Sequence, residues 1–270
     1  GFLGGSSAYN GGIFLRCGAS GTVTGSLDSV GGFVGQESSS YDDALFTECW
    51  ATNPGVTGAN DVGGFAGALE AERVIETYAV SPVIASGNNA GGFAGRLLGT
   101  LRDCYSRGAV SGKAHVGGLI GEMTNASLVA NSFATGRVQG NDAATNHGLV
   151  GLGGQVTNGY YDSVTTGRSD TGLGEPRTTA QMKSQATFVD WDFSLKWSLK
   201  NGINNGYPYL RNNIPQNNAN VPSDFNSDGK PDLVWQEMTT KQLYLWYMNG
   251  TTRTTGTYLT PKSVTGKWKA

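Results

Sequence analysis

The chain has 270 residues, a formal net charge of −2 and 42 glycines, whereas glycine is about 7% of an average protein. The glycines follow no collagen-like period of three, and charged residues are sparse and nearly balanced. Nucleic acids and anionic membranes need a basic face, so the composition favours neither as a partner. No apolar run reaches the roughly 18 to 20 residues that span a bilayer, so we expect no membrane insertion.

A glycine motif recurs along the first half of the chain. It consists of two glycines, an apolar residue, a small or apolar residue and a glycine. Complete or degenerate copies stand at 1–4, 31–35, 63–67, 91–95, 117–121 and 148–151. Residue 1 lies inside a copy and is not a start methionine, so we expect a mature or truncated piece of a longer protein.

A second motif repeats in phase with the first. It begins with a small side chain, usually followed by an aromatic residue, at Cys17, Cys49, Thr77, Cys104 and Ser132, with a worn copy at 160–163. Each unit of about 30 residues therefore carries two short β-like runs and a glycine turn. Such a unit cannot bury its apolar face alone, but stacked units can.

The two motifs together predict a parallel β-solenoid, or β-helix, of about six coils over residues 1–170. Neighbouring coils would pair their backbones about 4.8 Å apart, and equivalent side chains would stack. We expect one inward stack at Phe2, Phe33, Phe65, Phe93, Leu119 and Leu149, and a second, of small side chains, at the Cys/Thr/Ser positions. Glycine would be needed where a bend requires positive φ or leaves no room for a Cβ.

The doubled motif resembles the GLUG repeat, which is named for its Gly-Leu-apolar-Gly core. The resemblance covers roughly residues 1–165 and implies a bacterial surface or secreted protein, such as an adhesin. Residues 171–210, with aromatic residues at Trp191, Phe193 and Trp197, are similar to the segment that closes GLUG arrays. We expect this segment to cover the exposed end of the solenoid and its edge strands.

Residues 211–222 are polar, contain proline and lack periodic apolar residues, which predicts a linker. The module over 223–270 begins with a loop that is rich in side-chain oxygens. Asp224, Asn226, Asp228 and Asp232 occupy loop positions 1, 3, 5 and 9, with Gly229 at position 6. This spacing predicts a calcium ion held by those four side chains and by the backbone carbonyl of Lys230.

The calcium loop departs from an EF-hand, because Trp235 stands where that motif has its glutamate. Residues 233–235 and 243–248 instead indicate two paired strands. This arrangement is similar to the FG-GAP/VCBS repeat, the calcium-bearing blade of integrin-like propellers. The resemblance implies a small antiparallel β module, and either further blades beyond Ala270 or docking of this single blade on the solenoid.

Other reactive residues favour structural roles. Ladder neighbours lie slightly too far apart for a disulfide between Cys17 and Cys49, so small buried thiols are the preferred interpretation and the disulfide is the alternative. His115 and His147 precede glycine motifs and are interpreted as turn residues, so His115→Ala should cost little. Neither has the partners of a metal site or a catalytic triad.

Acidic pairs and arginines are the remaining candidates for chemistry. Asp42 with Asp43, and Asp190 with Asp192, could serve a glycosidase, but a solvated loop and a capped segment explain them better. The arginines of the coils are expected not to converge, because they fall at different phases of the repeat: Arg73, Arg96, Arg102, Arg107 and Arg137.

The sequence thus favours a non-catalytic, extracellular or cell-surface structural module of the adhesin type, stabilised by calcium at its C-terminal repeat. Its ligand would be a carbohydrate or a protein surface. One alternative is the subunit of an extracellular filament, because open solenoid ends can self-associate. Another is a carbohydrate-active enzyme of the β-helix type, which would be favoured by three or more charged side chains converging in a groove.

Overall fold

The computed structural model describes residues 3–6, 12–38, 45–70, 73–215, 233–236, 239–240, 242–249 and 252–263. Residues 1–199 with 207–213 form one compact unit, and 200–206 with 214–270 form the second. The predicted solenoid and capping segment therefore fall largely into one unit. The predicted fold class is confirmed: the first unit is a parallel β-solenoid and the second contains a small antiparallel sheet.

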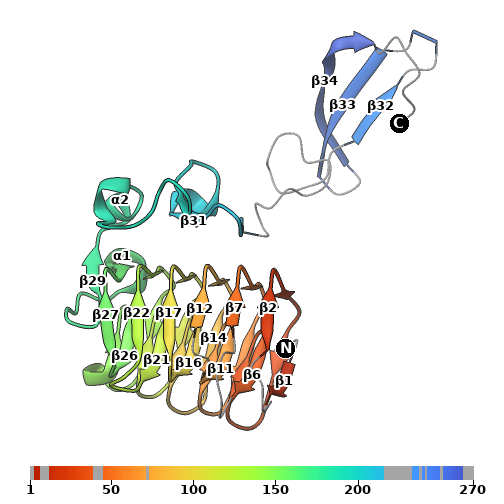
Figure 1. The fold of residues 1–270 in the computed structure, drawn as a ribbon. Coiled ribbons are helices and arrows are strands. Elements are labelled where there is room, and N and C mark those ends of the chain that lie inside the picture. Colours follow the sequence, from red (N-terminus) through yellow and green to blue (C-terminus); the bar gives the residue numbers. More distant parts are fainter. Residues whose placement is uncertain are drawn as a thin grey trace. The chain divides into compact units, whose positions relative to one another are not determined.

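Five parallel sheets run along the solenoid, and within each sheet the strands stack in the order of the chain (Figure 1). Sheet A contains β1 (Leu3–Ser6), β6 (Val34–Glu37), β11 (Ala66–Leu69), β16 (Ala94–Leu97), β21 (Ile120–Met123) and β26 (Val150–Leu152). Sheet B contains β2 (Ile13–Leu15), β7 (Leu45–Thr47), β12 (Arg73–Ile75), β17 (Thr100–Arg102), β22 (Leu128–Ala130) and β27 (Gln155–Thr157).

The other three sheets complete each coil. Sheet C contains β3 (Gly18–Ala19), β8 (Trp50–Ala51), β13 (Tyr78–Ala79), β18 (Tyr105–Ser106), β23 (Phe133–Ala134), β28 (Tyr160–Asp162) and β29 (Glu175–Arg177). Sheet D contains β4 (Val23–Thr24), β9 (Val56–Gly58), β14 (Val83–Ala85), β19 (Val110–Ser111) and β24 (Val138–Gln139). Sheet E contains β5 (Val30–Gly31), β10 (Val62–Gly63), β15 (Ala90–Gly91), β20 (Val116–Gly117) and β25 (Asn146–His147).

The first predicted stack is the core of the solenoid. Phe33, Phe65, Phe93, Leu119 and Leu149 are all fully buried, whereas Phe2 lies outside the described residues. The Phe65 ring lies 4.9 Å from that of Phe33 and 5.0 Å from that of Phe93, stacked in both cases. The glycine motif therefore places one large apolar side chain per coil at the same inward position.

The motif glycines are needed for space. A Cβ on Gly63 would lie 2.0 Å from the carbonyl oxygen of Ala66, and one on Gly67 would lie 2.3 Å from the carbonyl carbon of Ser29. The positive φ angles of the coils fall mostly on other residues: Arg16, Ser29, Glu48, Asp61, Glu76, Asn89, Asp103, His115, Asn131 and Asn158. The prediction of glycine at crowded positions is thus confirmed, but the left-handed bends are made by polar residues next to the glycine and Cys/Thr/Ser motifs.

Two connections keep the same length in every coil. Two residues join sheet B to sheet C, as at 76–77 and 103–104, and two join sheet E to sheet A, as at 64–65 and 92–93. The connection from sheet A to sheet B varies instead, from 98–99 in one coil to 124–127 in the next. Differences in coil length are therefore absorbed without disturbing the two repeated motifs.

The second predicted stack is also observed. Cys49, Thr77, Cys104 and Ser132 are fully buried, and Cys17 is half-buried. The Thr77 hydroxyl donates to the carbonyl of Ile75 at 2.9 Å and accepts the backbone N–H of Cys49, in the preceding coil, at 3.2 Å. Ser132 bonds Ala130 and Cys104 in the same way, at 2.8 and 3.1 Å. Each hydroxyl thus joins two coils.

We expect Thr77→Val to lower the free energy of unfolding by about 1 to 3 kcal/mol, because it leaves the buried N–H of Cys49 without an acceptor. Thr77→Ser is the matched control, since the Ser132 hydroxyl already makes both bonds. Urea denaturation of the two variants would measure the difference. Equal losses would show that the bond between coils contributes nothing.

The C-terminal end of the solenoid is closed by residues 163–177. Gly64 and Gly92 donate their N–H groups to carbonyls of the following coil, at 3.3 Å each. Gly148 donates instead to the Asp170 carboxylate at 3.0 Å. The Arg168 guanidinium donates to the Val138 carbonyl at 3.2 Å. The segment therefore supplies hydrogen bonds that a further coil would make.

The segment that follows covers the side of the solenoid. It contains α2 (Thr179–Met182), a 3-10 turn at Gln185–Thr187, β30 (Trp197–Ser198) and β31 (Tyr209–Leu210), whereas α1 (Ser163–Thr166) belongs to the closing segment before it. Other 3-10 turns lie at Ala143–Thr145 and Asn204–Gly206. We call residues 178–199 with 207–213 the lateral cover. The expectation that the capping segment closes the end thus holds for the stretch up to 177, but the rest packs on the outward face of sheet C.

An aromatic ladder lies beneath the lateral cover. The rings of Tyr78, Tyr105 and Phe133 stack at 5.1 and 5.0 Å on the outward face of sheet C. All three are fully buried, because one cluster joins them to residues of the cover: Met182, Phe188, Trp191, Trp197, Tyr207 and Leu210. The solenoid therefore has an inner core and an outer aromatic layer.

The second unit contains one three-stranded antiparallel sheet, β32 (Leu233–Gln236), β33 (Gln242–Asn249) and β34 (Thr252–Ser263). The two predicted strands correspond to β32 and β33, which pair Leu233 with Trp246. The third strand was not predicted, because its threonine-rich sequence lacks an apolar alternation.

Candidate functional site

Acidic side chains at the corner between sheets B and C, where the backbone is left-handed, hold the lateral cover in place. The Asp103 carboxylate is almost fully buried. It lies 2.6 Å from the Lys196 ammonium and accepts the indole N–H of Trp197 at 3.1 Å. Glu76, one coil earlier, lies 3.8 Å from Lys196. Burial raises the pKa of Glu76, while Lys196 opposes that rise.

Two further polar contacts hold the ends of the cover. The Tyr207 hydroxyl donates to the buried carboxylate of Asp162 at 2.7 Å. The Asn213 amide donates to the carbonyls of Cys49 and Glu76, at 2.8 and 2.9 Å. Residues 211–213, predicted as the start of the linker, therefore belong to the cover, because this amide satisfies two carbonyls of the corner.

One hydroxyl in the aromatic layer is not satisfied. The Tyr105 oxygen is buried and has no hydrogen-bond partner among the described residues, and burial raises its pKa. Because Phe133 fills the same position one coil later, Tyr105→Phe should raise the free energy of unfolding by about 1 kcal/mol. Tyr207→Phe is the opposite control, since it removes a bond to Asp162. Chemical denaturation would compare them, and a loss of stability in Tyr105→Phe would contradict the assignment.

A row of polar side chains runs from coil to coil along the corner just before sheet E, where the backbone is left-handed. The Asn89 amide donates to the Asp61 carboxylate at 2.8 Å, and the His115 Nδ1 lies 2.8 Å from the Asn89 oxygen. Arg96 lies 3.9 Å from Asp61, and Glu122 lies 3.8 Å from His115. Arg96 therefore lies near one carboxylate of this corner, that of Asp61, because sheet A lies beside the corner.

The histidines have structural positions. His115 has a φ of 52° and takes the turn position held by Asn89 one coil earlier. His147 lies in β25 and its Nδ1 is 3.2 Å from the carbonyl oxygen of Val150. The turn interpretation is thus correct for His115 but wrong for His147. In the coil of His147, the longer connection at 140–145 forms the bend before sheet E.

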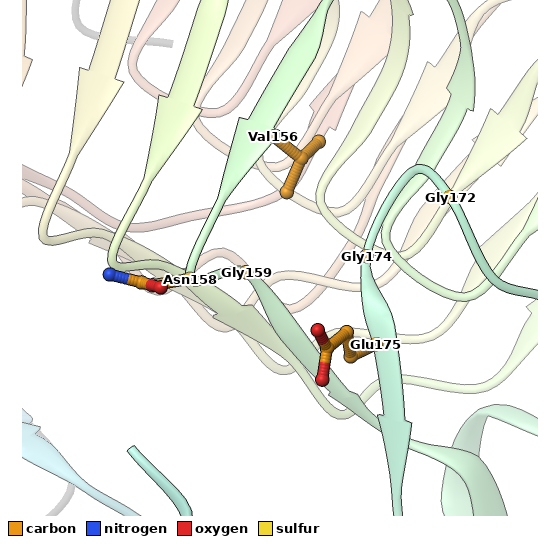
Figure 2. A pocket seen from close by; sticks show the side chains of 6 residues that line it. All are labelled: Val156, Asn158, Gly159, Gly172, Gly174 and Glu175. Atoms are coloured by element: carbon orange, nitrogen blue, oxygen red, sulfur yellow. The ribbon is translucent and has the colours of Figure 1, made fainter. Parts of the chain in front are cut away.

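The end of the solenoid has a small pocket of about 140 Å³. Figure 2 shows its lining, which consists of Val156, Asn158, Gly159, Gly172, Gly174 and Glu175. The Glu175 carboxylate pairs with Arg177, and the Asn158 amide donates to Asn131 at 3.3 Å. The lining contains one acidic residue and no nucleophile with a neighbouring base, so it lacks the parts of a hydrolytic site.

The cysteines are free thiols. Burial raises the pKa of Cys49 to about 11, and burial also raises the pKa of Cys104 well above its usual value. Their sulfurs donate to backbone carbonyls, at 3.3 Å from Cys49 to Phe14 and 3.2 Å from Cys104 to Arg102. Such thiols are poor nucleophiles, because the thiolate is the reactive form.

The predicted calcium ligands lie outside the described residues: Asp224, Asn226, Asp228, Lys230 and Asp232. So do Asp42 and Asp43. Within the part of the chain that is described, no group of three or more histidine, cysteine or acidic residues could hold a metal ion. Among the same residues, no helix is both long and apolar enough to span a membrane. The calcium site stays a prediction.

Comparisons with known proteins find a partial match. Over 102 residues the chain is 41% identical to a protein of Evansella cellulosilytica named "Putative Gly-rich membrane protein". The match covers 35% of this chain and 11% of that protein. No protein-family model matches the chain. No solved structure matches it either.

Proposed function

We propose that the chain is a non-catalytic structural module of the bacterial cell surface, of the adhesin type, in which the solenoid forms a stiff spacer. The observation that carries this proposal is the solenoid itself. Its coils are joined by in-register backbone pairing and by two inward stacks. Its outer aromatic layer is sealed by the lateral cover. The name of the relative supports a location at the cell envelope.

The resemblances are part of the same proposal. The glycine motif and its phase favour a GLUG-type array, and the calcium loop followed by antiparallel strands favours an FG-GAP/VCBS-like module. The ligand would be a carbohydrate or a protein at the surface. Immunolabelling of intact cells, compared with permeabilised cells, tests the location. Labelling that requires permeabilisation would overturn it.

The closed C-terminal end favours the spacer over a filament subunit, because residues 163–177 occupy the place of a further coil. We expect sedimentation velocity to give a single monomeric species across a wide range of protein concentration. Growth of the sedimenting species with concentration would favour the filament. Release of reducing or unsaturated sugar ends from polysaccharides by the purified chain would favour the enzyme.

Calcium removal is expected to act on the second unit alone. Three carboxylates within nine residues repel one another unless a cation offsets their charge. A chelator should therefore lower the melting temperature of the module at 223–270 and leave the solenoid nearly unchanged. Asp228→Ala should reproduce the effect without chelator. Calorimetric titration of this variant with calcium should give no binding heat, whereas the parent chain should give one. An unaltered module in both experiments would rule out the site.

A further inference from the structure

One face of the sheet in the second unit presents a positioned arginine. The Arg253 guanidinium lies over two rings of β33, at 5.6 Å from the centroid of Tyr244 and 5.1 Å from that of Trp246. Its Nε donates to the Thr255 carbonyl at 3.4 Å. Arg253 is nevertheless exposed. Two rings and a carbonyl thus hold an accessible cation in one orientation.

A glycine makes room for this arrangement. Gly256 pairs with Trp246 across the two strands. A Cβ on Gly256 would lie 2.8 Å from Cε1 of Tyr244 and 3.1 Å from Cδ1 of Trp246. Tyr258 meets Tyr244 edge to face at 4.6 Å and is 50% exposed. The face therefore combines a fixed guanidinium with an accessible ring.

The sequence that follows Glu237 carries charge of one sign. Residues 238–270 contain no aspartate or glutamate, and their charged side chains are Lys241, Arg253, Lys262, Lys267 and Lys269. None of the ion pairs in the described part of the chain includes Arg253. The near-neutral charge of the whole chain thus conceals a basic C-terminal stretch, which attracts an acidic partner.

We propose that Tyr244, Trp246, Arg253 and Tyr258 form a binding site for a carboxylate-bearing sugar unit of an acidic polysaccharide. The planar guanidinium matches a carboxylate with two parallel hydrogen bonds. Its fixed position reduces the entropy lost on binding. The half-exposed ring of Tyr258 offers an apolar surface for the sugar ring. The exposed threonines of β34 add hydroxyls that exchange hydrogen bonds with those of a sugar.

A nucleic acid is less suited to this face. Single strands bind through successive exposed rings along a basic groove, whereas Tyr244 and Tyr258 meet edge to face at 84°.

The inference rests on the proposed surface function for its choice of partner. It would also supply the ligand class that the proposed function leaves open.

The test is calorimetric titration of the full chain with trigalacturonate, at a fixed calcium concentration. The methyl ester of the same trisaccharide is the matched ligand, because it keeps the sugar rings and lacks the carboxylates. We expect binding of the acid and at least about tenfold weaker binding of the ester. This comparison does not depend on any variant folding.

Variants then locate the site. Arg253→Gln should weaken binding about tenfold or more. Arg253→Lys should also bind more weakly than the parent chain. Lysine keeps the charge but cannot donate the two parallel hydrogen bonds of a guanidinium. Arg137→Gln removes an exposed arginine from the solenoid and should change nothing. Circular dichroism would confirm that each variant is folded.

Three outcomes would overturn the inference: equal binding of acid and ester, equal weakening by Arg253→Gln and Arg137→Gln, or tighter binding of a single-stranded oligonucleotide than of trigalacturonate. A chain that labels intact cells but does not bind the acid would remove this inference alone. A chain that binds the acid but is not at the surface would instead remove the proposed function.

Discussion

Phe65→Ala is expected to lower the free energy of unfolding by about 3 to 5 kcal/mol, the usual cost of emptying a buried aromatic position. The ring touches three others, those of Phe33 and Phe93 in the neighbouring coils and that of Phe46 in sheet B, 5.6 Å away. Its loss would therefore leave a cavity in the middle of the core, where stacked backbones on both sides resist collapse. Urea denaturation followed by circular dichroism would measure the change.

Phe65→Leu is the matched control, because Leu119 and Leu149 fill the same position in later coils. We expect it to cost distinctly less than the alanine variant.

His115→Ala, which the sequence predicts to cost little, is not a neutral substitution in this structure. Histidine at a φ of 52° already bears the Cβ strain that alanine would bear, but the contact of its Nδ1 with the Asn89 oxygen would be lost. His115→Asn should be nearly neutral instead, and a large cost for it would contradict the equivalence of the coils.

Trp197→Ala is expected to have the second large effect, about 3 to 5 kcal/mol. The indole is fully buried, lies 4.5 Å from the ring of Trp191 and bonds to Asp103. Its removal would loosen the lateral cover and expose the aromatic ladder beneath it. Besides denaturation, we expect faster proteolysis within 178–213 and increased binding of a hydrophobic dye.

Leu195→Ala provides the control within the same segment, since Leu195 is 72% exposed. It should alter neither stability nor proteolysis. If Trp197→Ala lowered stability but left 178–213 as resistant as before, the cover would be held by other contacts. The outer layer would then not depend on this anchor.

The fold could be predicted from the sequence because the signal repeats. The position of Phe65 recurs in phase in every coil, so a single copy need not be decisive. The bends could not be assigned so well. Glu48, Glu76 and Asp103 read as ordinary charged surface residues, yet all three have positive φ. A sequence does not show that backbone pairing on both sides forces such residues into this conformation.

The lateral cover was the main difference between expectation and structure. An aromatic residue follows the small one in most copies of the second motif, as at Trp50, Tyr78 and Phe133. That regularity was a signal for a second buried layer. The sequence does not by itself predict that layer, because alternation along a strand places neighbouring residues on opposite faces, so one of them is expected to meet water. The acidic anchor at Asp103 depends on Lys196 and Trp197, which are more than 90 residues away in the chain.

The variable connection from sheet A to sheet B has a practical consequence. Since coils with connections at 98–99 and at 124–127 share one register on either side, chain can be added there without shifting the core. The same solenoid could therefore display grafted loops, one above another at the spacing of the coils, along a single side. Additions at 64–65 or 76–77 would instead displace Phe65 or Thr77 from its stack, and we expect those sites to reject them.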